Sequence, residues 1–596
     1  MVDAVRIRTE KAMSLTQAEC DVLVIGSGVG GMSAAITAAS RGLKVIVAEK
    51  AAYYGGTTAR SGGWLWIPNT HLAKAWGHHE LTDQALTYIR DQAGRGFDEA
   101  RVRAFLANGP KAVEFFTSST AVQFDMPLTF PDYHAEAPGA AQGGRSMVTR
   151  PYDARELGPL LKTLGPVLPE LTVFGVTIGS GKDIVHFMRV TRSLESAWYV
   201  TKRLMKHFRE VMKFGRGMTL TNGNALAARL ARSAADLDIP VWLSCPATRL
   251  LCEGGRVTGA VLERAGERIE VKARHAVVLA TGGFPHDIER RKSTYPHVQA
   301  GHGHYSPTPQ TNVGDGIRMA EAVGGVFDRS LSNAAAWTPM SLVPRKDGST
   351  GIMPHFIDRA KPGVIAVNLD GRRFANEANS YHDLVQAMIA TSKGKTETAC
   401  WLIADHAAIR RYGLGFVKPF PMPLGAHLRN GYLKRGKTVE ALAGEIGVDA
   451  ATLGATVRQY NECARVGRDL EFGRGSKAYN RYQGDALHAP NPCVEPLANG
   501  PFYAIKLVPG DLGSFMGLRT NEHAQALARD GSPIAGLYAA GNDAASIMGG
   551  EYNGAGITLG PGLTFGFIAA NHIAERARQV NSEPNSIPAQ ASLVAH

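Results

Sequence analysis

"DVLVIGSGVGGMSAAITAASRGLKVIVAEK", residues 21–50, is the stretch of sequence that decides the fold. Residues 21–26 form an apolar run that is typical of a buried parallel strand, and residues 30–42 form an alanine-rich segment that predicts a helix ended by Gly42. A second apolar run follows at residues 44–50. The order of strand, helix and strand predicts a βαβ unit.

The glycines of this stretch form a nucleotide-binding fingerprint. Gly26, Gly28 and Gly31 make the pattern G-x-G-x-x-G directly after the first strand and at the start of the helix. Such glycines permit a tight turn, bring a pyrophosphate close to backbone N–H groups and let the helix pack closely on the strand. Glu49, at the end of the second strand, is placed to accept hydrogen bonds from ribose hydroxyls. An adenine dinucleotide is therefore expected here.

The fingerprint alone does not distinguish FAD from NAD, because both share it. No second G-x-G-x-x-G follows a strand elsewhere in the chain. A bound flavin whose electrons leave to a separate acceptor therefore fits better than a flavin that a resident nicotinamide reduces.

Length and composition indicate a globular protein of more than one domain. The chain has 596 residues, with 44% apolar and 20% charged residues. Its formal charge of +12 is not clustered, since runs such as residues 290–292 are short, so a generally basic surface is favoured over nucleic-acid binding. The histidines at residues 78–79, 302 and 304 lack metal-like spacing, so no metal is expected.

The sequence favours a cytoplasmic protein. The six cysteines show no C-x-x-C pattern and read as buried thiols of a reducing compartment. Residues 1–20 have no continuous apolar core typical of a secretory signal, and no uncharged run is as long as a membrane span of about 18–20 residues. Residues 171–181, "LTVFGVTIGSG", are apolar and glycine-broken; a buried loop is favoured, while a substrate mouth or a peripheral membrane contact stays open.

The chain divides into a nucleotide-binding domain with a second domain inserted before its C-terminus. Residues 1–328 and 499–580 are expected to form the first domain, with a helical excursion over about 75–215. Residues 329–498 form the expected catalytic, substrate-binding domain, with helices near 384–412 and 438–466. A closing helix is expected over 563–580, and residues 581–596 read as a loose tail.

Several motifs together resemble the flavoproteins of the fumarate reductase and 3-ketosteroid dehydrogenase superfamily. Besides the fingerprint they are "GGTTARSGGWLWIPN" (55–69), "VVLATGGF" (277–284), "PGVIAVNLDGRRFANE" (362–377), "GLYAAGNDAASIMGG" (536–550) and "MGGEYNGAGITLGPGLTFGF" (548–567). The resemblance spans most of the chain. It implies an α/β fold: a Rossmann-like FAD-binding domain of the glutathione-reductase type with an inserted α+β catalytic (capping) domain.

The resemblance also implies a non-covalent FAD and the residues around it. The predicted cofactor-binding residues are Gly26, Ser27, Gly28, Gly30, Gly31, Glu49, Lys50, Gly56, Thr57, Thr58, Ser61, Gly62, Gly63, Ala247, Thr281, Gly282, Gly541, Asn542, Gly556, Thr558 and Leu559.

The residues that would touch the substrate indicate which branch of the superfamily this chain resembles. Fumarate reductases hold a dicarboxylate with arginines, because the guanidinium pairs with a carboxylate bidentately. Where those arginines fall, this chain has Tyr552 in "MGGEYNGAG" and Tyr381-His382 in "RFANEANSYHD". A C4 dicarboxylate is therefore a poor substrate.

The tyrosines instead match the 3-ketosteroid Δ1-dehydrogenase branch. The chain resembles it at Tyr552 and Gly556, at Tyr381, and at the aromatic pair Phe130 and Tyr133 of "FPDYHAEAPG". It departs from that branch's pattern at Glu551, Asn553 and His382, which leaves the reaction type intact and puts the substrate in doubt.

The chemistry of ketone desaturation gives these residues roles. Tyr552 and the N–H of Gly556 would stabilise the developing enolate oxygen as an oxyanion-hole pair. Tyr381 would abstract the α proton, with Tyr133 donating to it, while hydride passes to flavin N5. The residues expected to line the substrate slot are Phe130, Ser61, Trp337 and Phe356.

The sequence therefore predicts an FAD-dependent 1,2-desaturation of a 3-ketosteroid or related cyclic ketone, with a quinone or other external electron acceptor. Two alternatives stay open. One is a dehydrogenase or reductase of a smaller cyclic ketone or enone on the same fold. The other is a non-catalytic electron-transfer flavoprotein subunit, which predicts no turnover of free ketones.

Overall fold

The computed structural model describes residues 17–127 and 129–582, and its architecture is α/β, as predicted. A large sheet has the strand order β10-β2-β1-β13-β12-β11, with β23 added beside β13 and β22 beside β23. Its strands are β1 (Gln17–Ile25), β2 (Val45–Ala48), β10 (Val241–Trp242), β11 (Ala247–Glu253), β12 (Arg256–Arg264), β13 (Glu267–Leu279), β22 (Gln525–Leu527) and β23 (Pro533–Ala539).

The predicted βαβ unit is present at the centre of this sheet. β1 pairs in parallel with β2 and with β13, and α1 (Val29–Ser40) connects β1 to β2. The side chains of residues 22–24 are fully buried, because a parallel strand is covered on both faces. The apolar run that predicted the strand thus belongs to the core.

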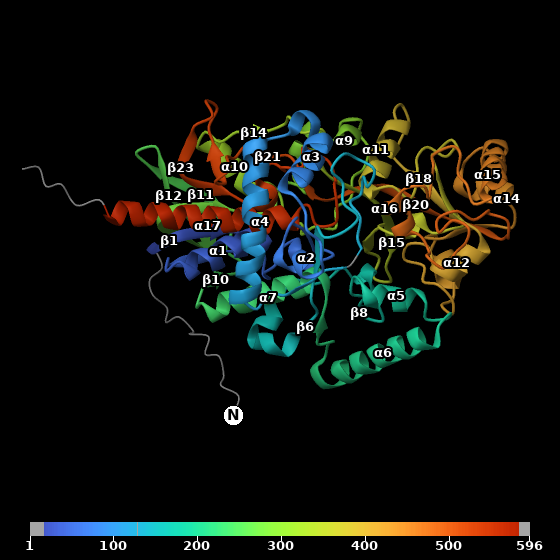
Figure 1. Cartoon of the computed structure of the whole chain (residues 1–596), viewed down its shortest axis with the longest axis horizontal. Helices are drawn as coiled ribbons and strands as arrows, with labels where there is room; N and C mark the ends of the chain where they lie inside the picture. The colour runs from blue at the N-terminus through green and yellow to red at the C-terminus, as the bar shows by residue number, and fades with distance from the viewer. Residues whose placement is uncertain (1–16, 128, 583–596) are drawn as a thin grey trace, which may run out of the picture.

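The closing helix packs against α1. α17 (Leu559–Ser582) begins four residues before the predicted helix, and Figure 1 shows it running beside α1. The two helices approach so closely that a Cβ at Gly566 would lie 2.4 Å from the carbonyl oxygen of Gly30. Glycine at residue 566 is therefore what allows the last helix to cover the first.

A second, antiparallel sheet forms the other half of the molecule (Figure 1). Its order is β16-β15-β20-β18-β17, with β19 also paired to β20. Its strands are β15 (Ala335–Pro344), β16 (Thr350–Pro354), β17 (Val364–Val367), β18 (Cys400–Ala404), β19 (Lys434–Gly436) and β20 (Phe502–Ser514), and the helices of this region are α11 (Tyr381–Thr391), α12 (His406–Tyr412), α13 (Gly425–Arg429), α14 (Val439–Ile446), α15 (Ala450–Ala464) and α16 (Ala478–Gln483).

Two sequence expectations differ from the structure in this half. The helical segment expected near 384–412 contains the buried strand β18, because its short apolar run pairs with β17 and β20. β20 lies beyond residue 499, where the first domain was expected to resume, yet it pairs with β15 and β18 of the second sheet. The domain limits as a whole stay a prediction.

The helical excursion carries long helices and short hairpins. The excursion and the segments on either side of it contain α2 (His71–Ala75), α3 (Thr82–Ala93), α4 (Glu99–Ser119), α5 (Lys182–Met188), α6 (Leu194–Phe214) and α7 (Asn222–Asp236), with β3 (Trp64–Trp66), β4 (Phe124–Asp125) and β5 (Ser146–Thr149) in a small sheet and β6 (Tyr152–Asp153) paired to β9 (Thr219–Leu220). The remaining elements are α8 (Ile288–Thr294), α9 (Pro296–Gln299), α10 (Asp315–Ala322), β14 (Phe327–Asp328) and β21 (Gly517–Leu518).

Residues 171–181 are not the buried loop that was favoured. β7 (Thr172–Val173) and β8 (Val176–Thr177) form a hairpin, and Phe174 at its tip is 58% exposed. Within the described part of the chain, no helix has the length and apolarity needed to cross a membrane. Of the expected tail, residues 581–582 end α17 and residues 583–596 lie outside the described residues.

A buried ion cluster fixes the segment between β17 and α11. The guanidinium of Arg373 is bidentate to Glu377, with Nε to Oε1 and Nη2 to Oε2 both at 2.9 Å, and also bidentate to Asp469 at 2.8 and 2.9 Å. Glu377 Oε1 accepts in addition from the N–H of Ala366 in β17, at 3.1 Å. The cluster therefore joins the second sheet to the loop that leads into α11.

Replacing Arg373 by methionine should destabilise the protein by about 3–5 kcal/mol, because the buried carboxylates of Glu377 and Asp469 both lose its guanidinium. Among the described residues Glu377 then keeps one ion pair, with Arg474 at 3.2 Å. Denaturant unfolding followed by far-UV circular dichroism measures the loss. Its neighbour Arg372 is exposed, and Arg372→Met should change stability by no more than about 0.5 kcal/mol. Equal stabilities of the two variants would contradict the role of the cluster.

Candidate active site

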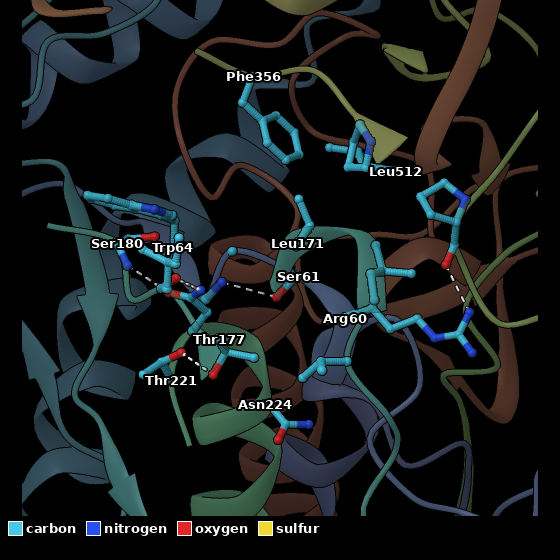
Figure 2. A pocket seen from close by; sticks show the side chains of 18 of the residues that line it. Arg60, Ser61, Trp64, Leu171, Thr177, Ser180, Thr221, Asn224, Phe356 and Leu512 are labelled. Carbon is cyan, nitrogen blue, oxygen red and sulfur yellow. Dashed lines mark hydrogen bonds between the residues drawn. The ribbon is translucent and has the colours of Figure 1, made fainter. Parts of the chain in front are cut away.

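One large cavity of about 1310 Å³ is lined by residues from both halves of the molecule. The turn after β1, the end of β2 and the start of α17 contribute on the side of the large sheet, and residues 353–354, 356–358, Tyr381 and 417–422 contribute from the second half. Figure 2 shows part of its lining, including Trp64, Leu171 and Phe356. Since pockets for one ligand commonly measure about 300–1,000 Å³, this cavity has room for a cofactor and a substrate.

The turn after β1 is shaped for the approach of a ligand. A Cβ at Gly31 would lie 2.0 Å from the carbonyl oxygen of Gly26, so the glycine permits α1 to pack on β1. Gly28 is the N-cap of α1, and a Cβ there would have only Thr58 Oγ1, at 3.7 Å, as a neighbour; the N–H of Val29 donates to the same Oγ1 at 2.9 Å, and Gly28, Val29 and Gly30 line the cavity. The helix N-terminus therefore opens onto the cavity, where it suits a pyrophosphate.

Glu49 is held in position by neighbouring donors. Its Oε2 accepts from Ser27 N at 3.0 Å and from Ser27 Oγ at 2.6 Å, and its Oε1 accepts from Ala51 N at 2.8 Å. A carboxylate offers about four acceptor sites, so capacity remains for a hydroxyl in the cavity. This donor set fits the ribose of an adenine dinucleotide.

The structure brings the predicted cofactor-side residues together. All of them line the cavity except Gly31, which lies beneath the turn. Sequence reasoning missed Asp543, which comes directly after the "AGN" motif: it accepts from Thr281 N at 2.5 Å, Thr281 Oγ1 at 2.9 Å and Gly283 N at 2.9 Å. Its carboxylate, whose pKa burial raises, thus fixes the loop at 281–283.

Three tyrosines pack against one another at the wall of the cavity. The rings of Tyr133 and Tyr552 are stacked with centroids 5.5 Å apart, and the ring of Tyr381 stands edge-on to Tyr552 at 4.9 Å and to Tyr133 at 5.6 Å. The hydroxyl of Tyr133 donates to that of Tyr381 at 3.3 Å. Three tyrosines from distant parts of the chain therefore meet at one site.

Burial governs the acidity of these phenols. It raises the pKa of Tyr552 to about 12, and the hydrogen bond with Tyr381 opposes this rise. Burial, and next the neighbouring Tyr133 and Tyr552, raise the pKa of Tyr381 well above its ordinary value. All three phenols are therefore protonated donors at neutral pH in the absence of a ligand.

Gly556 lies at the same wall. Its φ is +99°, and a Cβ there would lie 2.5 Å from the backbone of Leu65. Its carbonyl accepts from Trp66 N at 3.1 Å, while its own N–H meets no backbone acceptor within residues 17–127 and 129–582. This N–H and the hydroxyl of Tyr552 are thus two donors beside one cavity.

Three of the four predicted substrate-side residues line the cavity. They are Ser61, Phe130 and Phe356, and the Phe356 ring lies 5.3 Å from that of Tyr381. Trp337 does not reach the cavity. It is 1% exposed, its indole packs on Tyr295 and donates to Asn333 Oδ1 at 2.9 Å, and its backbone N–H donates to Nδ1 of His382 at 3.0 Å.

Tyr479 is a further member of the cluster that sequence reasoning missed. Its ring lies 4.4 Å from that of Tyr133, and Gln483 Nε2 donates to its hydroxyl at 2.9 Å. A tyrosine in the short polar helix α16 carries no sequence signal for such a role. Among the described residues, no group of three His, Cys, Asp or Glu side chains is placed to hold a metal ion.

Comparison with known proteins agrees with this geometry. A family model described as an FAD binding domain matches residues 21–559. A 4-oxocyclohex-2-ene-1-carboxylate 5-dehydrogenase of Sinomonas cyclohexanicum is 42% identical over 577 residues, which cover 96% of this chain and 97% of that protein. A 3-oxosteroid 1-dehydrogenase of Mycobacterium tuberculosis is 35% identical over 576 residues, covering 94% of this chain and 100% of that protein.

Among solved structures, a 3-ketosteroid Δ1-dehydrogenase of Sterolibacterium denitrificans in complex with 1,4-androstadiene-3,17-dione superposes with a TM-score of 0.87 at 36% identity, covering 94% of this chain and 100% of that one. The FAD-binding fold with a capping domain, predicted from the motifs, is confirmed. The chain belongs to the FAD-binding-domain flavoprotein family, in the group that contains the 3-ketosteroid Δ1-dehydrogenases, and it is an FAD-dependent oxidoreductase acting on CH–CH groups.

Proposed function

We propose that this protein desaturates a cyclic ketone at the carbons next to its carbonyl. The observation that carries the proposal is the packing of Tyr133, Tyr381 and Tyr552 on one another at the cavity wall that also holds Gly556. Both curated relatives are dehydrogenases of ring ketones, which supports the same reaction class here.

Tyr552 and Gly556 polarise the carbonyl. Loss of an α proton leaves negative charge on the carbonyl oxygen, and two donors aimed at that oxygen stabilise it in a site without water. The Tyr552 hydroxyl and the N–H of Gly556 are the donors that the geometry offers. The high pKa of Tyr552 keeps its proton in place as a hydrogen-bond donor.

Tyr381 takes the α proton in this proposal. Its hydroxyl receives a hydrogen bond from Tyr133 at 3.3 Å, which orients it, and its ring is 4.9 Å from that of Tyr552. The base and the carbonyl donor are thus adjacent, as removal of a proton next to a carbonyl requires. FAD, when bound, supplies the acceptor for the hydride of the neighbouring carbon.

More specifically, the proposed substrate is a 3-ketosteroid, which the protein would desaturate at its 1,2 position. The mostly apolar lining of the cavity, with Phe130, Trp64 and Phe356, fits a rigid apolar ring system. A smaller cyclic ketone is the second candidate, because the relative that is 42% identical acts on a single oxocyclohexene ring. Electrons leave to an external acceptor such as a quinone, since the chain has one dinucleotide fingerprint.

We also propose that α6 contacts a membrane surface. Apolar side chains recur along its outer face at helical spacing, with Leu194 92%, Trp198 61% and Met212 81% exposed. Exposed Lys202, Lys206, Arg209 and Lys213 accompany them, as in helices that lie on anionic lipid. Figure 1 shows α6 at the lower edge of the molecule, and its inner residues Val200 and Leu204 line the cavity.

Mixing the oxidised enzyme anaerobically with androst-4-ene-3,17-dione or with 4-oxocyclohexanecarboxylate should bleach the flavin colour. Tyr552→Phe should lower kcat about 10²–10³-fold while FAD stays bound, because one oxyanion donor is lost. Stopped-flow absorbance measures both. Tyr538→Phe, a buried tyrosine of β23 that does not line the cavity, is the control and should turn over normally. Normal turnover by Tyr552→Phe would remove that residue from the mechanism.

The rate should rise with pH. Because burial raises the pKa of Tyr381 well above its ordinary value of about 10, only a small fraction is phenolate at pH 7, and this fraction increases about tenfold per pH unit below the pKa. kcat/KM measured from pH 6 to 10 should therefore climb on a single limb. Tyr381→Phe should lose the activity together with this limb; a pH-independent wild-type rate would argue against a phenol base.

The double variant Trp198→Glu and Met212→Glu should no longer sediment with vesicles that contain phosphatidylserine, whereas the wild type should bind them, and more weakly at high salt. The matched control places glutamates at Ile288 and Leu470, which are 59% and 76% exposed elsewhere on the surface. Equal sedimentation of both double variants would speak against α6.

A further inference from the structure

A lysine that has no ion-pair partner among the described residues lines the cavity. Lys418 lies in the loop between α12 and α13 and lines the cavity together with Met353 and Phe356. The residue is half-buried. Within residues 17–127 and 129–582 its ammonium has no ion pair and no hydrogen bond, and Nζ lies 5.3 Å from the centroid of the Phe416 ring.

The groups around Lys418 do not neutralise it. Asp358 is the acidic group that acts on it, but that carboxylate already accepts from His355 Nδ1 at 2.6 Å and from Gly415 N at 3.0 Å. The imidazole of His427 also lies near and carries no negative charge. Burial lowers the pKa of Lys418, which reflects the poor solvation of its charge.

Other charged side chains along this part of the cavity leave the balance positive. Asp485 is taken by Arg192 Nη1 at 3.0 Å and by the hydroxyl of Tyr412 at 2.8 Å. Arg189 also lines the cavity and is half-buried. A half-buried cation that lacks a counter-ion is costly, and an anionic ligand group removes that cost.

A series of contacts links the catalytic tyrosines to the loop of Lys418. Tyr381 contacts Phe356, with ring centroids 5.3 Å apart, and Asp358, two residues after Phe356, accepts from Gly415 N of the Lys418 loop at 3.0 Å. Apolar residues thus separate the donors at Tyr552 from the ammonium. A ligand that spans them needs a ketone at one end, an apolar body and an anion at the other end.

We propose that Lys418 binds a carboxylate at the end of the substrate remote from the ketone, so that the substrate class is an anionic oxo acid with an apolar ring body. The inference rests on the proposed ketone desaturation. It adds a specificity-determining residue from the second half of the molecule, and it requires no further chemical step. A carboxylate accepts hydrogen bonds from an ammonium, and such charged pairs are stronger than neutral ones.

The test compares two oxo acids, each with its neutral methyl ester: the short 4-oxocyclohexanecarboxylate and the long 3-oxochol-4-en-24-oate. For whichever of the two acids the wild type turns over with the higher kcat/KM, Lys418→Met should lower kcat/KM about 10- to 100-fold, the range expected for a hydrogen bond to a charged group. For the methyl ester of that acid the loss should be less than about twofold. The loss should appear in KM, since the contact is the same in the ground and transition states.

Lys434→Met is the matched control, because this half-buried lysine of β19 does not line the cavity and its loss changes the net charge equally. Lys418→Arg should keep the preference for the acid, and Lys418→Glu should reverse it. Added salt should raise KM for the acid in the wild type and not in Lys418→Met.

Equal kcat/KM for acid and ester in the wild type, or an equal effect of Lys418→Met on both, would overturn this inference while ester turnover upholds the proposed function. Failure to turn over any acid or ester would instead defeat the proposed function itself. Circular dichroism and flavin content of Lys418→Met, matched to those of Lys434→Met, show that a selective loss is not a folding defect.

Discussion

The site depends on a backbone segment that is pressed against its neighbours too closely for side chains. A Cβ at Gly549 would lie 2.5 Å from Ala93, one at Gly554 2.5 Å from Trp66, and one at Gly556 2.5 Å from Leu65. Tyr552 is thus an aromatic side chain in a segment with glycines on both sides, at 549, 550, 554 and 556. Because the segment cannot shift, the Tyr552 hydroxyl and the N–H of Gly556 keep a fixed relation, which is what an oxyanion site requires.

The same segment, residues 549–556, holds the loop that carries Tyr133. The carbonyl of Asn553 accepts from Tyr133 N at 3.0 Å and from the hydroxyl of Tyr88 at 2.7 Å. Next to Tyr133, buried Asp132 receives Arg145 Nη1 at 2.6 Å. Tyr381 comes from the other half of the molecule, at the first turn of α11. A base from one half and an oxyanion donor from the other can work together only when the two halves are packed, so the packing of the halves is itself part of the site.

Sequence reasoning succeeded where chemistry imposes a local pattern. The βαβ unit, the glycine turn and Glu49 lie within about thirty residues, and each has a backbone reason. It failed where long-range pairing decides: β18 needs β17 and β20 to be a strand, and Trp337 is turned into the core by its contacts with Tyr295 and His382. Tyr479 and Lys418 carry no local pattern, so the tertiary structure alone reveals them.

Burial at the site works in two opposed directions. It excludes water, which strengthens each hydrogen bond to a developing enolate, but it also raises the pKa of Tyr381 and so makes the base scarcer at neutral pH. A buried phenol can therefore act as the base only where the substrate proton is made acidic by strong donors, and Tyr552 and Gly556 meet that need because their geometry is fixed in advance. The three tyrosines form one unit for this reason: the pKa that keeps Tyr552 a donor and the contacts that orient Tyr381 arise from the same packed rings.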